Sequence, residues 1–444
     1  MSLFKRIVSN GIASTLDKLA KMAEHLLLVP FFIYFWGVDV YGEWLTLMIL
    51  PTVFALSHLG FGNAVGNTFI LEYLGGAKNK AANTLATGIS IINYGVILIS
   101  VISLLILFGL KEFGIFNKML INPSEAAISI YLMFCIPLVT FYLAVYEQFY
   151  KLAKKAHIGI FISACTTILK IIVAVVLLNH GSGPLGIASG FLIITIIMNI
   201  IYIYISKKIF KDKDLKEGKF DRNILGFLFF KGIGYFLNPL WRALYFQGTT
   251  LLIRVMLGPS AVVIYNTMRV LMNTSAQVFN IVSSSIYPDF QVAVGEKNPK
   301  KVNNLFSFIF ISNIIVAIAF MIFISIFGKD IYVWWTKGKI LVPNDIWIYF
   351  ISSVIFYAMW FSQSLIFESH NKPYSLTLTG ILVSIISVST TWFSIKILGI
   401  NGIGVGVLIF DLTMFLVLSK ISSNLVKSSF FQIFRIFGFK GVRK

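Results

Sequence analysis

The sequence predicts an all-α polytopic membrane protein, with about 12 transmembrane helices in two pseudo-symmetric six-helix lobes around a central cavity. Two observations predict this fold class. The first is composition: 57% of the 444 residues are hydrophobic, mean hydropathy is +0.86 and only 12% of residues are charged. The second is an internal repeat, in which segments of the first half recur about half a chain length later.

The repeat is visible in three pairs of short segments. The pairs are 77–83 with 296–303, 149–154 with 367–372, and 186–190 with 402–406. Many transporters build a central path between two lobes from a duplicated bundle of membrane helices. The repeat therefore makes transport the leading functional interpretation.

Apolar runs of about 18 residues or more, separated by short polar or glycine-containing loops, give the individual helices. The predicted spans are 11–36, 41–66, 82–110, 126–150, 157–179, 184–206, 224–256, 260–288, 303–327, 345–368, 374–397 and 400–423. They divide into an N-terminal lobe, residues 1–206, and a C-terminal lobe, residues 224–423. Residues 207–223 are charged and are predicted to form a cytoplasmic basic linker. Residues 424–444, rich in Phe, Lys and Arg, are predicted to be a basic amphipathic tail on anionic membrane lipids.

Lys and Arg are concentrated in the loops on one side of these spans. That side holds Lys78 and Lys80, the Lys151–Lys155 loop, the linker and the tail, whereas the other side holds few basic residues. Because positively charged loops stay in the cytoplasm, both termini are predicted to be cytoplasmic.

The net charge of +19 does not indicate a nucleic-acid partner, because the basic residues lie in short loops and a tail between apolar spans. Cys135 and Cys165 each lie in an apolar run, where a metal or disulfide framework is not expected. The sequence contains no Gly-rich phosphate loop and no nucleophile elbow. No enzyme activity, no cofactor and no metal are therefore predicted.

Two consecutive spans each carry a polar stripe with an arginine near mid-depth. Steps of three and four residues place each stripe on one helix face. The stripe of span 224–256 is Lys231, Tyr235, Asn238, Arg242, Tyr245 and Thr249, and that of span 260–288 is Asn266, Arg269, Asn273, Gln277, Asn280 and Ser284. One interpretation is helix-to-helix packing with the arginines paired to internal carboxylates. The other, which we favour, is a hydrated cationic cavity.

The first span, the repeat partner of span 224–256, carries Asp17, Lys18, Lys21, Glu24 and His25. Basic groups outnumber acids on the polar spans, which favours an anionic ligand. Lys170 and Asp411 also lie deep in spans, where each is read either as a functional group or as half of an interlobe salt bridge.

Two motifs resemble those of the polysaccharide-export flippases, the Wzx-type O-antigen translocases of the multidrug/oligosaccharidyl-lipid/polysaccharide (MOP) superfamily. The motifs are Trp36-Gly37-Val38-Asp39-Val40-Tyr41-Gly42-Glu43-Trp44 and Leu59-Gly60-Phe61-Gly62-Asn63-Ala64. The paired lobes, short loops and basic linker extend the resemblance to the whole chain.

The resemblance implies two lobes that open alternately to the two sides of the cell inner membrane. Its implied substrate is an undecaprenyl-diphosphate-linked O-antigen or polysaccharide repeat unit, flipped from the cytoplasmic to the periplasmic leaflet in lipopolysaccharide biosynthesis. Other polysaccharide-assembly membrane proteins are candidate partners.

The resemblance also assigns roles to residues. Lys21, His25, Arg242 and Arg269 are expected to contact the head group, and Tyr235, Asn238, Tyr245, Asn273 and Gln277 the sugars. Asp17, Glu24 and Asp411 are candidates for ion coupling or ion pairing.

Two alternatives remain at this point. A cation-coupled multidrug exporter of the same superfamily shares the fold, but its ligand is often cationic, which a basic cavity disfavours. A membrane polysaccharide-assembly enzyme such as an O-antigen polymerase would need a large outer loop, and the longest predicted outer loops are short.

Overall fold

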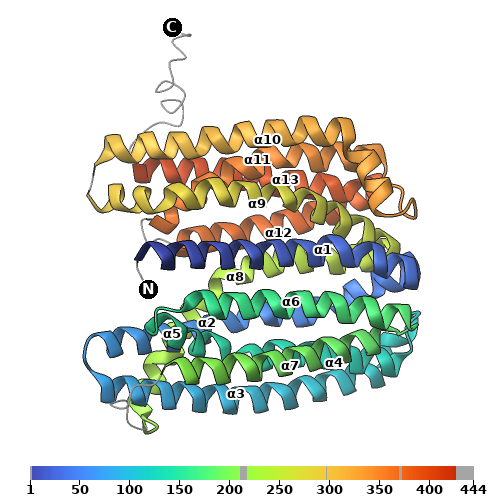
Figure 1. The fold of residues 1–444 in the computed structure, drawn as a ribbon. Helices are drawn as coiled ribbons and strands as arrows, with labels where there is room; N and C mark the ends of the chain where they lie inside the picture. The colour runs from blue at the N-terminus through green and yellow to red at the C-terminus, as the bar shows by residue number, and fades with distance from the viewer. Residues whose placement is uncertain (1–2, 211–217, 297, 370–372, 427–444) are drawn as a thin grey trace. The chain divides into compact units, whose positions relative to one another are not determined.

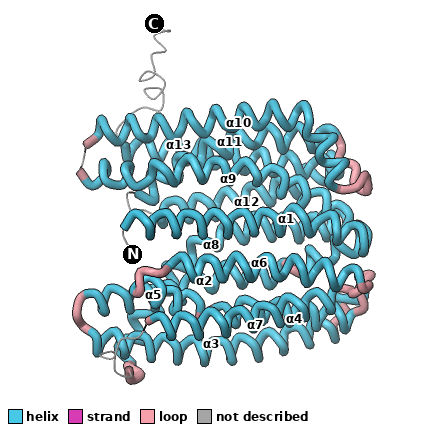
Figure 2. Tube along the Cα trace, in the orientation of Figure 1, coloured by secondary structure: helices cyan, strands magenta, loops and turns pink. Residues whose placement is uncertain are grey.

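The computed structural model describes residues 3–210, 218–296, 298–369 and 373–426. In this part of the chain every regular element is a helix, and Figure 2 shows only short loops between them. Within each part of the chain the long helices lie side by side in Figure 1, and the all-helical class predicted from composition is confirmed.

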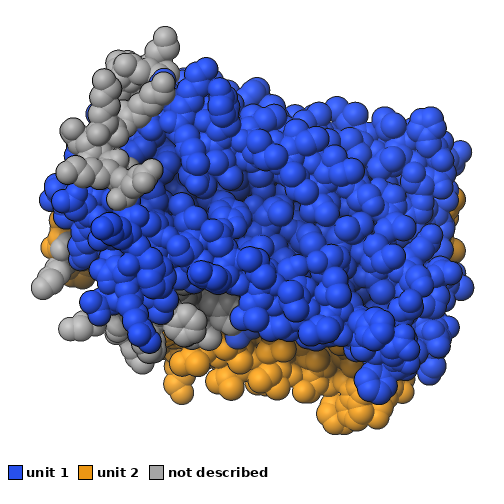
Figure 3. All heavy atoms as spheres, turned by 90° about the horizontal axis from the view of Figure 1, so that it is seen from below, with its two compact units in different colours: residues 1–240 blue, residues 241–444 orange. Residues whose placement is uncertain are grey.

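The chain forms two compact units, residues 1–240 and residues 241–444, coloured blue and orange in Figure 3. We call them unit 1 and unit 2. The boundary falls within α8, Arg222–Leu257. Of the predicted linker, residues 211–217 lie outside the described residues, as do residues 427–444 of the predicted tail.

Unit 1 contains seven helices before α8. They are α1 Leu3–Leu47, α2 Ile49–Leu74, α3 Lys78–Glu112, α4 Pro123–Thr140, α5 Leu143–Leu152, α6 Ala156–Asn179 and α7 Pro184–Ile209. A short 3-10 turn, η1 Ile115–Lys118, precedes α4. Because α4 and α5 together occupy one predicted span, unit 1 supplies six long helices before α8.

Unit 2 contains the second half of α8 and five further long helices. They are α9 Pro259–Gly295, α10 Pro299–Trp335, α11 Asn344–Ser369, α12 Pro373–Leu398 and α13 Gly402–Val426, with a 3-10 turn, η2 Gly399–Asn401, before α13. The prediction of twelve long helices is therefore confirmed.

Eight segments of the described chain are long and apolar enough to cross a membrane. Two of them, Val8–Ala55 and Tyr374–Ser422, are 48 and 49 residues long, so each has the length of two crossings. The eight do not include α8 and α9, although the sequence predicts both as membrane spans. These two helices carry the polar stripes.

The first predicted break, after residue 36, appears as a kink rather than a loop. Gly37 has φ 77° and ψ 173°, outside helical geometry, while α1 continues on both sides. A positive φ suits glycine, which has no Cβ to clash with the backbone.

Unit 1 has an aromatic core where α2, α5, α6 and α7 meet. Phe69, Phe149, Tyr150 and Tyr202 are buried there, and the Tyr150 hydroxyl donates to the backbone carbonyl of Tyr202 at 2.8 Å. This hydrogen bond fixes α5 against α7.

Unit 2 is held by a second aromatic core and by one buried polar junction. Trp241, Trp360 and Phe410 belong to the core. Nearby, Nδ2 of Asn313 on α10 donates to Oγ of Ser362 on α11 at 2.8 Å and to Oγ of Ser283 on α9 at 3.2 Å. The junction ties three helices together, and α9 and α11 are two walls of the cavity described next.

Candidate functional site

Unit 2 encloses a cavity between α8, α9, α11 and α13. Its empty volume, including the open mouth, is about 680 Å³. Five residues predicted to be functional from the sequence line it: Arg242, Tyr245, Arg269, Asn273 and Asp411. The polar stripes of α8 and α9 therefore contribute to one cavity.

Arg269 is held among aromatic rings on the cavity wall. Its guanidinium carbon lies 4.9 Å from the ring centre of Phe246 and 5.5 Å from that of Tyr265. Nη2 donates to Oδ1 of Asn266 at 2.8 Å. The charge is thus stabilised by ring faces and an amide rather than by a carboxylate.

Arg242 is the more exposed of the two arginines. Its guanidinium carbon lies 5.1 Å from the ring centre of the neighbouring Trp241. The carboxylate of Glu368 on α11 is near enough to attract it. Neither Arg242 nor Arg269 takes part in a salt bridge among the described residues, so the predicted pairing to internal carboxylates is not observed there.

Asp411 is a buried carboxylate on α13 that also lines the cavity. Its Oδ1 accepts a hydrogen bond of 2.9 Å from Nε1 of Trp360 on α11, and the hydroxyl of Ser353 lies close by. Within the described residues Asp411 forms no salt bridge.

Several polar atoms around the cavity are buried without a hydrogen-bond partner. They are Nη1 of Arg269, Oη of Tyr265, Nε1 of Trp241 and Oγ1 of Thr249. The Tyr265 hydroxyl lies near both Arg269 and Thr249. All four groups can donate a hydrogen bond, and an unsatisfied buried donor costs about 1–3 kcal/mol. These donors lie beneath the surface of the cavity wall, and Thr249 is outside the lining.

Aromatic side chains make up much of the remaining wall. Tyr245 stacks on Phe410 with ring centres 3.6 Å apart, and Trp241 lies parallel to Phe410 at 6.1 Å. Tyr357 packs edge-on against Trp360 at 5.0 Å. Tyr245 was predicted from the sequence, whereas Trp241, Tyr357, Trp360 and Phe410 were not. Aromatic residues within apolar spans are common, and only the packing shows which of them face a cavity.

The remaining predicted residues of unit 2 are outside this lining. Gln277 on α9 is exposed and does not line the cavity. Tyr235 and Asn238 belong to the part of α8 whose side chains lie outside the described residues, as does Lys231.

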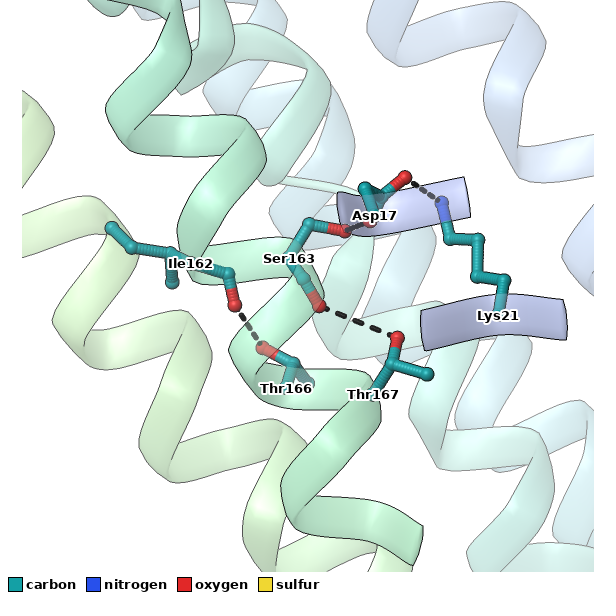
Figure 4. A network of polar contacts seen from close by, with 6 residues as sticks. All are labelled: Asp17, Lys21, Ile162, Ser163, Thr166 and Thr167. Atoms are coloured by element: carbon teal, nitrogen blue, oxygen red, sulfur yellow. Dashed lines mark hydrogen bonds and ion pairs between the residues drawn. The ribbon is translucent and has the colours of Figure 1, made fainter. Parts of the chain in front are cut away.

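The polar face of α1 forms a separate network in unit 1, shown in Figure 4. Oδ2 of Asp17 pairs with Nζ of Lys21 at 2.7 Å, one helical turn away. Oδ1 of Asp17 accepts from Oγ of Ser163 on α6 at 2.8 Å. Asp17 therefore joins α1 to α6 and positions Lys21, and Ser163 is a partner that the sequence did not reveal.

The other predicted residues of α1 lie farther along the same helix. His25 is exposed and Glu24 is partly buried. The Glu24 carboxylate attracts the Lys170 ammonium of α6, which also lies 6.0 Å from the ring centre of Phe191. The described residues of the chain contain no cluster of His, Cys, Asp and Glu that could hold a metal ion.

Comparisons with known proteins identify the fold. No protein-family model and no curated protein matches the chain. Among solved structures, the chain is similar to an inward-facing multidrug resistance MATE family transporter of the MOP superfamily, with 14% identity, a TM-score of 0.75 and coverage of 96% of this chain and 99% of that chain.

Two further structures give the same result. An outward-facing MATE transporter of the MOP superfamily is 16% identical, with a TM-score of 0.63 over 96% of this chain and 97% of that chain. A MATE structure in the straight conformation is 14% identical, with a TM-score of 0.62 over 95% of each chain. The chain therefore has the two-lobed, multi-pass membrane fold of the MATE transporters of the MOP superfamily.

Proposed function

We propose that the chain is a lipid-linked oligosaccharide flippase of the cell inner membrane. It moves undecaprenyl-diphosphate-linked O-antigen or polysaccharide repeat units from the cytoplasmic to the periplasmic leaflet by alternating access. The fold supports the transport part of this proposal, because the similar structures include both inward-facing and outward-facing conformations.

The observation that carries the choice of substrate is the pair of arginines in the unit 2 cavity. Arg242 and Arg269 both line it, and neither forms a salt bridge among the described residues. A guanidinium group matches the oxygens of a phosphate, and two cations that form no salt bridge on one cavity wall favour an anionic ligand. A diphosphate head group supplies such an anion.

The aromatic and amide groups of the cavity support the oligosaccharide part. Tyr245 and Asn273 line it beside the arginines. Tyrosine offers an apolar face and a polar hydroxyl, and asparagine both donates and accepts hydrogen bonds. Together they match sugar rings, whose faces are apolar and whose edges carry hydroxyls.

Multidrug export is a second candidate, and the fold supports it equally. The similar structures include multidrug resistance transporters. One observation in the cavity also favours it: Asp411 is a buried carboxylate among aromatic rings, a combination that attracts organic cations. Against it stand the two arginines, which repel such ligands. Nothing in the fold similarity favours a polysaccharide polymerase.

A single reconstitution distinguishes the two transport functions. The purified chain is placed in proteoliposomes with either a fluorescent undecaprenyl-diphosphate-linked oligosaccharide or the cationic dye ethidium. Flipping is read from the exposure of the glycan to a membrane-impermeant glycosidase, and export from dye fluorescence. The proposal expects flipping without dye transport. Dye transport in the absence of flipping would establish the exporter instead.

A further inference from the structure

We infer that the unit 2 cavity binds a glycosyl phosphate, namely the sugar joined directly to the diphosphate together with its adjoining phosphate, and that Asp411 and Trp360 select this sugar. The inference rests on the proposed function and assigns the head group and first sugar to separate groups of one cavity.

The phosphate is recognised by the guanidinium groups of Arg269 and Arg242. Both arginines line the cavity, and neither forms a salt bridge among the described residues. Nη2 of Arg269 is held by Asn266, which fixes the guanidinium on the cavity wall. Charge-assisted hydrogen bonds from a guanidinium to a phosphate are stronger than bonds between neutral groups.

The sugar is recognised by a hydrogen-bond acceptor, the carboxylate of Asp411. Asp411 is an acceptor, 6% exposed, and Trp360 fixes its Oδ1 through the 2.9 Å hydrogen bond. Because Asp411 forms no salt bridge among the described residues, its carboxylate is not neutralised by Arg269 or Arg242. A carboxylate held in this way suits a ring hydroxyl or an acetamido N–H of a ligand.

Aromatic rings form another part of the cavity wall, in addition to the arginines and Asp411. Tyr245 and Phe410 stack on each other, and Trp241 lies parallel to Phe410. The C–H faces of a pyranose pack well on such rings. The cavity is open at its mouth, so the rest of the oligosaccharide can lie outside it.

Other ligand classes leave part of this cavity unused. Inorganic phosphate pairs with the two arginines but makes no use of the aromatic wall or Asp411. An organic cation pairs with Asp411 but is repelled by the two arginines. A neutral sugar lacks the anion. A glycosyl phosphate meets all three requirements.

The test measures binding by isothermal titration calorimetry to the full chain in detergent. N-acetylglucosamine 1-phosphate is compared with cyclohexyl phosphate, which has a similar shape and charge but no ring hydroxyls. Asp411→Asn and Trp360→Phe are the test variants. Asp345→Asn is the control, because Asp345 lies outside the cavity lining and accepts from Asn401. Thermal unfolding of every variant verifies that it is folded.

The wild-type chain and Asp345→Asn are expected to bind the glycosyl phosphate about tenfold or more tightly than cyclohexyl phosphate, as one charged hydrogen bond implies. Asp411→Asn is expected to remove this preference and leave the affinity for cyclohexyl phosphate within about twofold, since that ligand makes no such bond. Trp360→Phe should reduce the preference in the same direction, because it releases the carboxylate.

Equal affinity of the wild-type chain for the two phosphates overturns the inference while leaving an anion site and the proposed function. The same holds if Asp411→Asn weakens both ligands equally. Binding of tetraphenylphosphonium without binding of either phosphate overturns the inference and the proposed function together.

Discussion

Both carboxylate oxygens of Glu43 accept a hydrogen bond from the backbone N–H of Leu120, each at 2.8 Å. Oε2 also accepts from the N–H of Ile121 at 3.0 Å. Glu43 is only 1% exposed, and it fastens the segment between α3 and α4 to the end of α1. Backbone donors compensate the cost of burying this carboxylate. The motif 36–44 thus has a structural role within unit 1.

Replacing Glu43 with Gln is expected to destabilise unit 1. The amide is neutral and has one acceptor oxygen where the carboxylate has two, so the N–H groups of Leu120 and Ile121 both lose a charged acceptor, at a cost of about 1–3 kcal/mol. The thermal unfolding midpoint in detergent should fall. The matched control is Glu112→Gln at the exposed end of α3, which should unfold as the unaltered chain does. Equal midpoints for the two variants would contradict the role assigned to Glu43.

The arginines of the cavity are expected to be essential for flipping. Replacing Arg242 or Arg269 with Gln should reduce the rate to background, because losing one charge from an anion site costs about 2–5 kcal/mol. Lys should be tolerated only in part, since an ammonium lacks the bidentate fork of a guanidinium. The measurement is the glycosidase-accessibility assay in proteoliposomes.

A charge-matched control for these variants is Lys329→Gln in unit 2. Lys329 lies outside the cavity lining and is bonded to Asn344. Its flipping rate should match that of the unaltered chain. If both arginine variants flip the substrate normally at normal protein levels, Arg242 and Arg269 do not form an essential anion site.

The membrane potential is expected to drive the movement. One charge crossing the membrane gains about 2.3 kcal/mol per 100 mV, so a head group of charge about −2 leaving a negative interior gains about twice that. Imposing about −100 mV on proteoliposomes should therefore accelerate outward flipping without ATP. A rate that ignores the potential but stops when a proton or sodium gradient collapses would indicate coupled antiport instead. Asp17, Glu24 and Asp411 would then be the groups to replace.

The orientation of the loops gives a prediction that is independent of the substrate. The Lys and Arg bias places the α9–α10 connection near Asn298 in the cytoplasm and Lys118 and Lys337 outside. A reporter fused at Asn298 should give a cytoplasmic signal, and reporters fused at Lys118 or Lys337 should give an external signal. An external reading at Asn298 would refute the predicted orientation.

The helices could be predicted from the sequence because their ends carry local signals. Pro184 begins α7, as expected for a residue that favours the first helical turn. The predicted end at residue 206 is three residues early, because Lys207 and Lys208 are charged yet helical. The sequence predicted a break between helices after residue 36, and the structure has a kink at Gly37. The sequence could not predict a kink rather than a loop, because a glycine allows a positive φ but does not require one.

The candidate site was predictable only where periodicity revealed it. Arg242 and Tyr245 on α8, and Arg269 and Asn273 on α9, follow helical spacing in otherwise apolar spans, and all four line the cavity. The bond between Trp360 and Asp411 joins residues far apart in the sequence, and nothing local to either residue indicates the other. Such pairs follow from how α11 and α13 pack, so the sequence did not reveal the aromatic wall apart from Tyr245.

The Asn313 junction has a consequence for how the membrane-embedded chain is made. Lipid gives helices no hydrophobic reason to associate, so interhelical hydrogen bonds carry more of that task than they do in water. During synthesis α9 enters the bilayer before α10, and α11 enters last of the three. The amide of Asn313 can therefore bond to Ser283 at once but must wait for Ser362. The bond between Asn313 and Ser362 can form only after α11 has entered the membrane. The packing of α9, α10 and α11 is therefore completed late in the biogenesis of unit 2.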